Sequence, residues 1–319
     1  MTPFVDQVPL RDAARASLMA AIGQTPLVRL TTFEPHAGVE IYAKLESRNP
    51  GGSVKDRPAL AMILDAERRG LASAFATASA RQAHATLLDA TSGNTGIAYA
   101  MIAAARGHRA CLCVPANVTP ERLSILRAFG AEVVLTDPME TTDGAIIEAR
   151  GRHARYPGRY CYLDQYSNDA NWRSHYETTA VELFRQTDGG ITHFVAGLGT
   201  TGTFVGTSRR LRELTPGVVC VAVQPDSPLH DLEGLKHLPT AIVPPIWDPT
   251  VADETISIAT EEALALTDRL ARDAGLFVGP SSGAALAGCL EIARRTARGV
   301  IATIFPDGGD RYLSKGRSR

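Results

Sequence analysis

Short apolar runs and helical apolar stripes alternate along most of this chain. Runs rich in β-branched and aromatic residues predict strands at 41–45, 110–114, 133–135, 194–196 and 218–223. Between these runs, apolar residues that recur every three to four positions predict helices at 56–69, 96–106, 120–129 and 203–214. Glycines 70, 107 and 130 mark helix ends, and Thr119-Pro120 supplies an N-cap followed by a proline at the first helical position.

This order of elements is typical of an α/β protein with parallel sheets. At 319 residues the chain exceeds one average domain and suits two α/β lobes. Two stretches lie outside the pattern. We expect residues 1–21 to form a partly helical arm and the small-residue-rich stretch 73–85 to be an irregular connection.

Composition excludes several classes of function. The formal net charge is −1 and the sequence pI is about 6.7, so we expect no basic surface for nucleic acid or for an anionic membrane. The longest apolar run, at 96–105, is too short to span a bilayer. The first residues are charged and lack the apolar core of a secretory signal.

The five cysteines are scattered and odd in number. Cys111 and Cys113 alternate within a predicted strand, so their side chains face opposite ways and form neither a good disulfide nor a metal clip. The histidines show no ligand spacing either. We therefore predict reduced structural thiols in a cytoplasmic protein, with no metal site.

Four turns rich in Gly, Ser and Thr carry the candidate chemistry. They lie at 49–58, 91–96, 197–203 and 279–283, and each precedes a helical pattern. Backbone N–H groups at such turns, together with the positive end of a helix, bind phosphates and carboxylates. The first turn also contains Lys55, whose amine can form a Schiff base when partly desolvated. One lysine and three anion-binding turns indicate pyridoxal phosphate (PLP).

These four motifs, in this order, resemble the β-replacing PLP enzymes of the cysteine synthase family, from residue 22 to residue 314. Within the family, the segments 163–166, 191–195 and 234–240 resemble the cysteine synthase B group. The resemblance implies a two-lobed fold type II architecture, like tryptophan synthase β, in which each lobe has a mostly parallel twisted sheet flanked by helices. By that resemblance 1–43 is an arm and strand joining the large lobe, 44–159 a small mobile lobe, and 160–319 the large lobe.

The resemblance also assigns the cofactor contacts. Lys55 would form the Schiff base and later remove the substrate's α-proton. Asn94 would bond the 3′-oxygen, and Ser281, with Ser282 as the competing candidate, would face the pyridine nitrogen. A serine there leaves that nitrogen largely neutral, which suits expulsion of a β-leaving group. The phosphate cradle would be formed by Gly199, Thr200, Thr201, Gly202 and Thr203. Many relatives have glycine where Thr201 stands, whereas the B group accepts threonine.

Substrate contacts follow from the same resemblance. The substrate carboxylate would bind Thr91, Ser92, Gly93, Thr95 and Gln165. In the alternative interpretation the 91–96 turn is an ordinary helix cap and Gln165 an ordinary polar loop residue. Gly234, Lys236 and His237 lie where the B group has a basic pair beside the pocket, and such a pair favours an anionic nucleophile such as thiosulfate. That pair can also be a solvated surface pair, and Leu238 replaces the usual aromatic residue.

The implied reaction converts O-acetylserine and sulfide, or thiosulfate, to cysteine or S-sulfocysteine through an α-aminoacrylate, in an enzyme that is commonly a homodimer. Cystathionine β-synthase shares the four motifs, and an O-phosphoserine enzyme is a third possibility, although Gln224-Pro225-Asp226 stands where some of those enzymes carry an arginine. A catalytically silent partner-binding relative is the non-enzyme alternative. A nucleotide-binding Rossmann protein is disfavoured because the strand at 218–223 leads to Gln224 rather than to an acidic residue.

Overall fold

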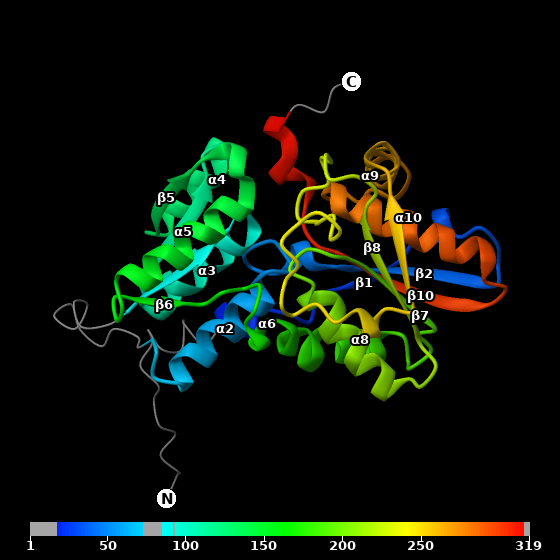
Figure 1. Cartoon of the computed structure of the whole chain (residues 1–319). Coiled ribbons are helices and arrows are strands. Elements are labelled where there is room, and N and C mark those ends of the chain that lie inside the picture. Colours follow the sequence, from blue (N-terminus) through cyan, green and yellow to red (C-terminus); the bar gives the residue numbers. More distant parts are fainter. Residues whose placement is uncertain (1–17, 73–84, 92, 316–319) are drawn as a thin grey trace, which may run out of the picture.

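The computed structural model describes residues 18–72, 85–91 and 93–315. Most of the predicted N-terminal arm, the connection at 73–84 and Ser92 therefore lie outside the described residues. Figure 1 shows two lobes, one around each sheet, with the C-terminal segment between them at the top. In the described part of the chain, no helix is long and apolar enough to cross a membrane.

The larger sheet has six strands in the order β1-β2-β10-β7-β8-β9. Only β1 is antiparallel to its neighbour, and the other four pairings are parallel. The strands are β1 (Leu27–Arg29), β2 (Val39–Leu45), β7 (His193–Gly197), β8 (Val219–Pro225), β9 (Glu254–Ile258) and β10 (Gly299–Phe305). Both faces of this sheet are covered, so the sequences of its central strands are almost continuously apolar rather than alternating.

Helices cover both faces of this sheet. Alternate strand residues such as Val195 and Val221 pack into one core with α9 (Thr260–Ala274) and α10 (Pro280–Arg295). Their neighbours Phe194 and Cys220 point the other way. They form a second core with α7 (Ala180–Gln186) and α8 (Gly202–Leu214). The period of two along each strand thus fixes which helices lie on which side.

The smaller sheet is wholly parallel, with strands in the order β5-β4-β3-β6. Its strands are β3 (Thr86–Ala90), β4 (Ala110–Pro115), β5 (Glu132–Thr136) and β6 (Tyr160–Tyr162). One face packs on α2 (Asp56–Arg68) and α3 (Asn94–Arg106), and the other packs on α5 (Thr141–Arg155). Helix α4 (Pro120–Ala128) packs beside α3. Helix α2 also contacts α6 (Asp169–Ser174).

Short helices complete the chain. A π-helical turn at His175–Thr179 joins α6 to α7. Among the described residues, 3-10 turns lie at Thr31–Phe33, Glu46–Arg48, Pro138–Glu140, Pro249–Val251 and Gly309–Lys315. The last of these is the C-terminal segment, shown in red in Figure 1.

The predicted α/β class with two parallel sheets is confirmed, and so are the strands and helices that the pattern indicated. Thr119 is the N-cap of α4 with Pro120 at its first position, and Gly107 ends α3 with a left-handed φ of +79°. The division into a mobile and a fixed lobe stays a prediction. The strand order shows that β2, with Lys44, belongs to the larger sheet and that β6, beyond residue 159, belongs to the smaller one. Strand pairing therefore carries the smaller sheet three residues past the expected boundary.

Candidate active site

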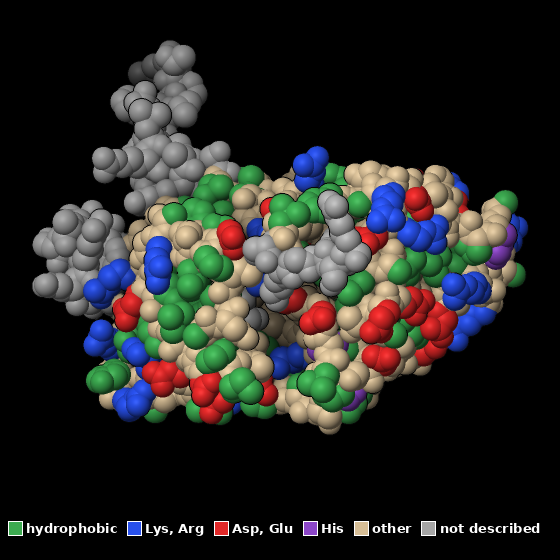
Figure 2. Space-filling view, turned by 90° about the horizontal axis from the view of Figure 1, so that it is seen from above, with side chains coloured by type: hydrophobic (Ala, Val, Ile, Leu, Met, Phe, Trp, Pro, Cys, Tyr) green, Lys and Arg blue, Asp and Glu red, His purple; other side chains and the backbone are tan. Residues whose placement is uncertain are grey.

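A cleft of about 670 Å³ lies where the carboxyl ends of strands from both sheets face each other. Ligand sites in open parallel sheets form at this edge. Figure 2 shows a hollow between the two lobes with charged side chains at its edges. The cleft brings together predicted site residues from all four Gly/Ser/Thr-rich turns: Lys55, Thr91, Gly93, Asn94, Thr95, Gly199, Thr200, Thr201, Thr203 and Ser281. Gln165, Gly234, Lys236 and His237, from outside these turns, line it as well. Gly202 follows Thr201 in the same turn.

Lys55 is positioned by a bridge between two distant segments. The Val54 N–H donates to the Pro306 carbonyl at 2.8 Å, and Ser53 pairs with Asp307 just after β10. Lys55 then forms the N-cap of α2, with its side chain only partly exposed. Burial lowers the pKa of Lys55 below its usual value, against the nearby charge of Asp307. A lysine in this position holds a neutral amine more readily than a surface lysine does.

The turn between β7 and α8 forms a cradle for an anion. Any side chain on Gly199 would collide with the Gly234 carbonyl, and one on Gly202 would collide with Asn171. Thr201 has φ +68°, a strained conformation for a β-branched residue and one that glycine adopts freely. Its Oγ1 is buried without a hydrogen-bond partner among the described residues. An unpartnered hydroxyl beside a helix N-terminus fits a phosphate oxygen.

Two side chains that the sequence did not single out support this cradle. The Asn171 amide donates to Thr200 Oγ1 at 3.2 Å and to the Gln165 carbonyl at 2.7 Å. His175 Nε2 lies 3.2 Å from Thr203 Oγ1, while its Nδ1 lies 2.9 Å from Thr179 Oγ1. Burial lowers the pKa of His175 well below its usual value, so the ring is neutral. Both residues act through a cradle threonine, so no local motif indicates them.

The turn after β3 is closed by its own hydrogen bonds. Thr91 Oγ1 accepts from the N–H groups of Gly93 and Gly96, at 3.1 and 3.0 Å, as a helix cap does. Thr95 donates to Gln165 Oε1 at 2.9 Å, and Gln165 Nε2 donates to the Ala90 carbonyl at 2.6 Å. Gly93 is the N-cap of α3 and no side chain caps it, so these bonds close the turn without deciding between the two interpretations of it. The contacts expected between the substrate carboxylate and donors at the start of α3 stay a prediction.

Asn94 is held by the C-terminal segment. Its amide donates to Asp307 Oδ2 at 2.6 Å, and its oxygen accepts from Arg311. Tyr312 also donates to Asp307, at 2.6 Å. The amide of Asn94 has two hydrogens. Its predicted contact with the 3′-oxygen can therefore coexist with the bond to Asp307.

Ser281 and Ser282 both lie in the first turn of α10 and are buried. Ser281 lines the cleft, whereas Ser282 is absent from the described lining residues. This placement supports the prediction that Ser281, rather than its neighbour, faces a bound ring nitrogen.

The segment 226–240 forms the outer wall of the cleft, and its basic pair is not simply solvated. Lys236 Nζ lies 3.3 Å from Asp143 Oδ1 and 5.3 Å from the centre of the Tyr166 ring. His237 Nδ1 lies 2.8 Å from Thr240 Oγ1. Glu233, from the same segment, pairs with Arg122 of α4. Two ion pairs thus join this wall to the smaller lobe.

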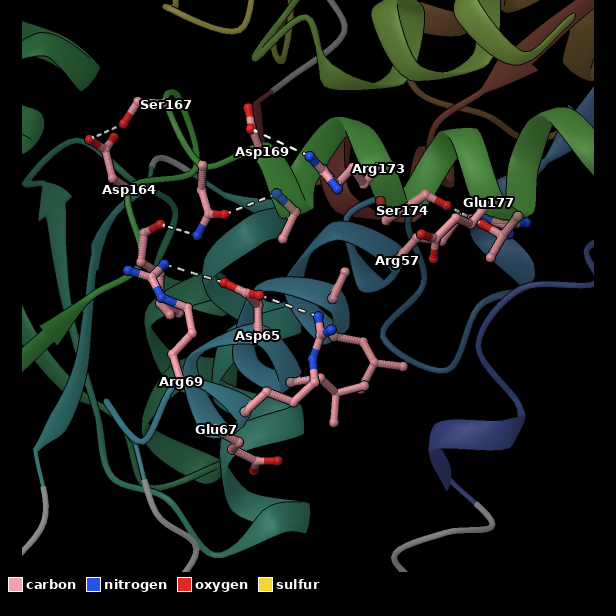
Figure 3. A pocket seen from close by; sticks show the side chains of 18 of the residues that line it. Arg57, Asp65, Glu67, Arg69, Asp164, Ser167, Asp169, Arg173, Ser174 and Glu177 are labelled. Atoms are coloured by element: carbon pink, nitrogen blue, oxygen red, sulfur yellow. Dashed lines mark hydrogen bonds and ion pairs between the residues drawn. The ribbon is translucent and has the colours of Figure 1, made fainter. Parts of the chain in front are cut away.

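A second cavity of about 970 Å³ lies between α2 and α6, next to the end of β6. Figure 3 shows that Asp65 and Arg69 lie close together there, as do Asp169 and Arg173. Asp65 pairs with Arg68 at 3.3 Å and with Arg69 at 3.4 Å. This cavity contains none of the predicted site residues.

The described residues contain no group of three or more His, Cys, Asp or Glu side chains placed to hold a metal ion. All five cysteines are buried and free. The chemistry available in the cleft is therefore an amine of lowered pKa, an anion cradle and hydroxyl donors.

Comparisons with known proteins agree with this chemistry. A family profile described as "Pyridoxal-phosphate dependent enzyme" matches residues 18–307. The chain is 51% identical to a cysteine synthase of Aquifex aeolicus, over 94% of this chain and 91% of the relative. It is 43% identical to cysteine synthase B of Salmonella typhimurium, over 94% and 95%. The crystal structure of an O-acetylserine dependent cystathionine β-synthase from Helicobacter pylori superposes with a TM-score of 0.85 at 35% identity, over 95% and 98%.

Proposed function

The chain belongs to the family of pyridoxal-phosphate dependent enzymes, and from that premise we propose how its cleft makes cysteine. The family resemblance, the cofactor and PLP-dependent cysteine synthesis, all predicted from the sequence, are confirmed. The residue roles given next are our proposal.

The observation that carries the proposal is one juxtaposition. A lysine of lowered pKa lies in the same cleft as a glycine cradle whose buried Thr201 hydroxyl has no partner in the described chain. These residues fit a phosphorylated aldehyde. Lys55 would hold its aldehyde carbon, the 199–203 turn its phosphate, Asn94 its 3′-oxygen and Ser281 its ring nitrogen. When bound, the cofactor supplies an electron sink that acidifies the α-proton of an amino acid.

The chain's own residues then exchange one β-substituent for another. Donors at Thr91, Gly93, Thr95 and Gln165 orient the carboxylate of O-acetylserine, and Lys55 takes the α-proton as acetate leaves with the electron pair of the Cβ–O bond. Hydrosulfide then forms the Cβ–S bond, and Lys55 returns a proton to the α-carbon. The balanced reaction is O-acetylserine plus hydrosulfide giving cysteine plus acetate.

We also propose that Lys236 and His237 bias the choice of nucleophile. Both line the cleft on the segment 226–240, and Lys236 is a cation held close to the Tyr166 ring. A cation at this wall attracts an anionic sulfur donor, so thiosulfate is a candidate second nucleophile that would yield S-sulfocysteine.

The test is a substrate matrix with the PLP-loaded enzyme. O-acetylserine and O-phosphoserine are each paired with sulfide, thiosulfate and homocysteine, and the products are identified by mass spectrometry. We expect cysteine from O-acetylserine and sulfide to form fastest. Turnover only with O-phosphoserine, or no turnover with any pair, would contradict the proposal.

A second candidate is O-acetylserine dependent cystathionine synthesis. The superposition on the Helicobacter pylori enzyme of that title favours it. In the matrix, a faster reaction of homocysteine than of sulfide would establish this alternative.

Two further features belong to the proposal. We propose a homodimer, to be tested by sedimentation equilibrium of the full chain. We also propose that the enzyme works in a reducing, cytoplasmic environment, which its five free and buried thiols suit.

A further inference from the structure

We propose that Asp143 is a specificity-determining residue that disfavours doubly charged sulfur donors by neutralising Lys236. This inference rests on the proposed function and concerns the same cleft. It reverses the simplest expectation from the basic pair, which is that Lys236 acts as an unopposed cation.

The geometry begins with two elements from different lobes. Asp143 lies in the first turn of α5 in the smaller lobe, where an acidic side chain is favoured by the helix dipole. Lys236 lies in the segment 226–240 of the larger lobe, where its N–H donates to the Leu198 carbonyl at 2.8 Å. That bond fixes the Lys236 backbone beside the turn that leads into the anion cradle.

The side chains of Asp143 and Lys236 meet at the cleft wall. Their charged atoms are 3.3 Å apart, and both residues line the cleft. The Lys236 side chain is 13% exposed, whereas that of Asp143 is 36% exposed. The carboxylate is therefore the more accessible partner, and an incoming anion meets it together with the ammonium.

The surrounding charges do not restore a positive field. Glu233 and Asp231 also line the cleft, and Glu233 pairs with Arg122 of α4, a further cation of the cleft lining. His230 and His237 line the cleft as well, and burial together with the charge of His237 lowers the pKa of His230 below its usual value. Lys236 and Arg122, which both line the cleft, are thus each paired with a carboxylate.

The consequence depends on the charge of the nucleophile. Thiosulfate carries two negative charges and hydrosulfide one, so a neighbouring carboxylate repels thiosulfate more strongly. Asp143 also competes with any anion for the Lys236 ammonium. The pair therefore favours hydrosulfide over thiosulfate, and removing the carboxylate alone should reverse part of that preference.

The experiment is a competition assay with Asp143→Asn. The PLP-loaded enzyme turns over O-acetylserine with sulfide and thiosulfate together, and mass spectrometry gives the ratio of S-sulfocysteine to cysteine. We expect the ratio in Asp143→Asn to be roughly three- to tenfold higher than in the parent enzyme, because one partly screened negative charge has been removed. The increase should be smaller at high ionic strength, where salt screens that charge. Calorimetry of thiosulfate binding to the resting enzyme should show tighter binding by a similar factor.

Matched variants keep the inference falsifiable. Glu148→Gln makes the same charge change on the same helix, at a residue that pairs with Arg152 and is not among the described residues of the cleft wall, so its ratio should be unchanged. Lys236→Ala should lower the ratio of S-sulfocysteine to cysteine. In the double variant, Asp143→Asn should raise that ratio by a smaller factor than it does in the parent enzyme, because the two residues act through one ion pair.

The outcomes distinguish a failure of the role of Asp143 from a failure of the proposed function. Cysteine formation with an unchanged or lower ratio in Asp143→Asn overturns the role of Asp143 alone. An equal rise in Glu148→Gln overturns it too, because the effect would then be one of net charge. Failure of the parent enzyme to use O-acetylserine overturns the proposed function, and this inference with it.

Discussion

The cleft and the outer cavity, two cavities formed by the described residues, differ in where their buried polar groups lie. The outer cavity between α2 and α6 is the larger, and several of its charged side chains pair with one another, as Asp65 does with Arg68 and Arg69. In the cleft, the buried Thr201 Oγ1 and Asp307 Oδ1 have no partner in the described chain. Native proteins rarely leave such groups unsatisfied, so each of them calls for an explanation.

The outer cavity has an unpartnered atom too, and it shows what else a site needs. Asp164 Oδ1 is buried there without a hydrogen-bond partner in the described chain. It does not lie beside a glycine turn at a helix start. In the cleft, the unpartnered hydroxyl, the close backbone approach at Gly199 and the start of α8 coincide. It is this combination that points to bound phosphate.

The largest expected effect tests the cleft. Lys55→Ala should reduce turnover of O-acetylserine and sulfide by more than the ~10²–10⁴-fold typical of losing a general base, because the cofactor anchor is lost as well. The measurement is kcat with saturating PLP. Arg68→Ala, in the outer cavity, is the control and should retain parental turnover. Near-parental turnover in Lys55→Ala would contradict the assignment of the reaction to the cleft.

The next effect tests the wall of the outer cavity. Arg57 lines it, and its guanidinium makes bonds of 2.7 Å to Glu46 and 2.6 Å to Glu182, with 2% of its side chain exposed. Arg57→Met leaves the buried Glu46 carboxylate uncompensated, which should lower the free energy of unfolding by about 3–5 kcal/mol. Urea unfolding measures this loss. A change below 1 kcal/mol would show that the network is not structural.

A smaller effect should appear in the pH dependence of stability. Burial raises the pKa of Asp89 to about 7, against hydrogen bonds from Tyr99 and two backbone N–H groups. Between pH values of about 4 and 7 the folded state therefore keeps a proton that the unfolded state has lost. Stability contributed by this group is complete below about pH 4 and is lost as the pH rises to about 7.

Asp89→Asn should flatten that slope. Asp56, whose pKa burial also raises to about 7, contributes a slope of the same sign, so some slope should remain in the variant. Urea midpoints at intervals between pH 4 and 8 give the comparison. A variant with the parental slope, or a steeper one, would contradict a protonated Asp89.

The smallest effect tests the rim of the outer cavity. The Arg69 side chain is 63% exposed and pairs with Asp65 at 3.4 Å. Exposed pairs of this kind contribute about 0.3–0.5 kcal/mol, so Arg69→Gln should barely move the urea midpoint and should leave turnover at the parental value. A clear loss of turnover would give the outer cavity a part in the reaction.

The sequence pattern predicts the parts of this fold that depend on local periods. The strand near 194–196 and the helix after Thr203 follow from apolar spacing, and the helix end at Gly107 follows from the freedom of glycine at positive φ. The four turns indicate the cleft because each carries its own local composition.

The rest depends on contacts between distant segments. The carboxylate of Asp143 meets Lys236, 93 residues away in sequence, only because the two lobes face each other. His175 reaches Thr203 through a π-helical turn that no local pattern marks. The strain at Thr201 also appears only in the backbone angle.

The most direct test of the central claim uses the scarcity of lysine. The chain has four lysines, Lys44, Lys55, Lys236 and Lys315, so reducing the PLP-loaded enzyme with borohydride and mapping its peptides can identify the attached residue without ambiguity. We expect the cofactor mass on the peptide of Lys55 alone, because Lys44 is fully buried and paired with Glu182 at 2.7 Å, and Lys236 is paired with Asp143. Label on Lys44 or Lys236, or an unlabelled chain, would contradict the assignment of the cleft.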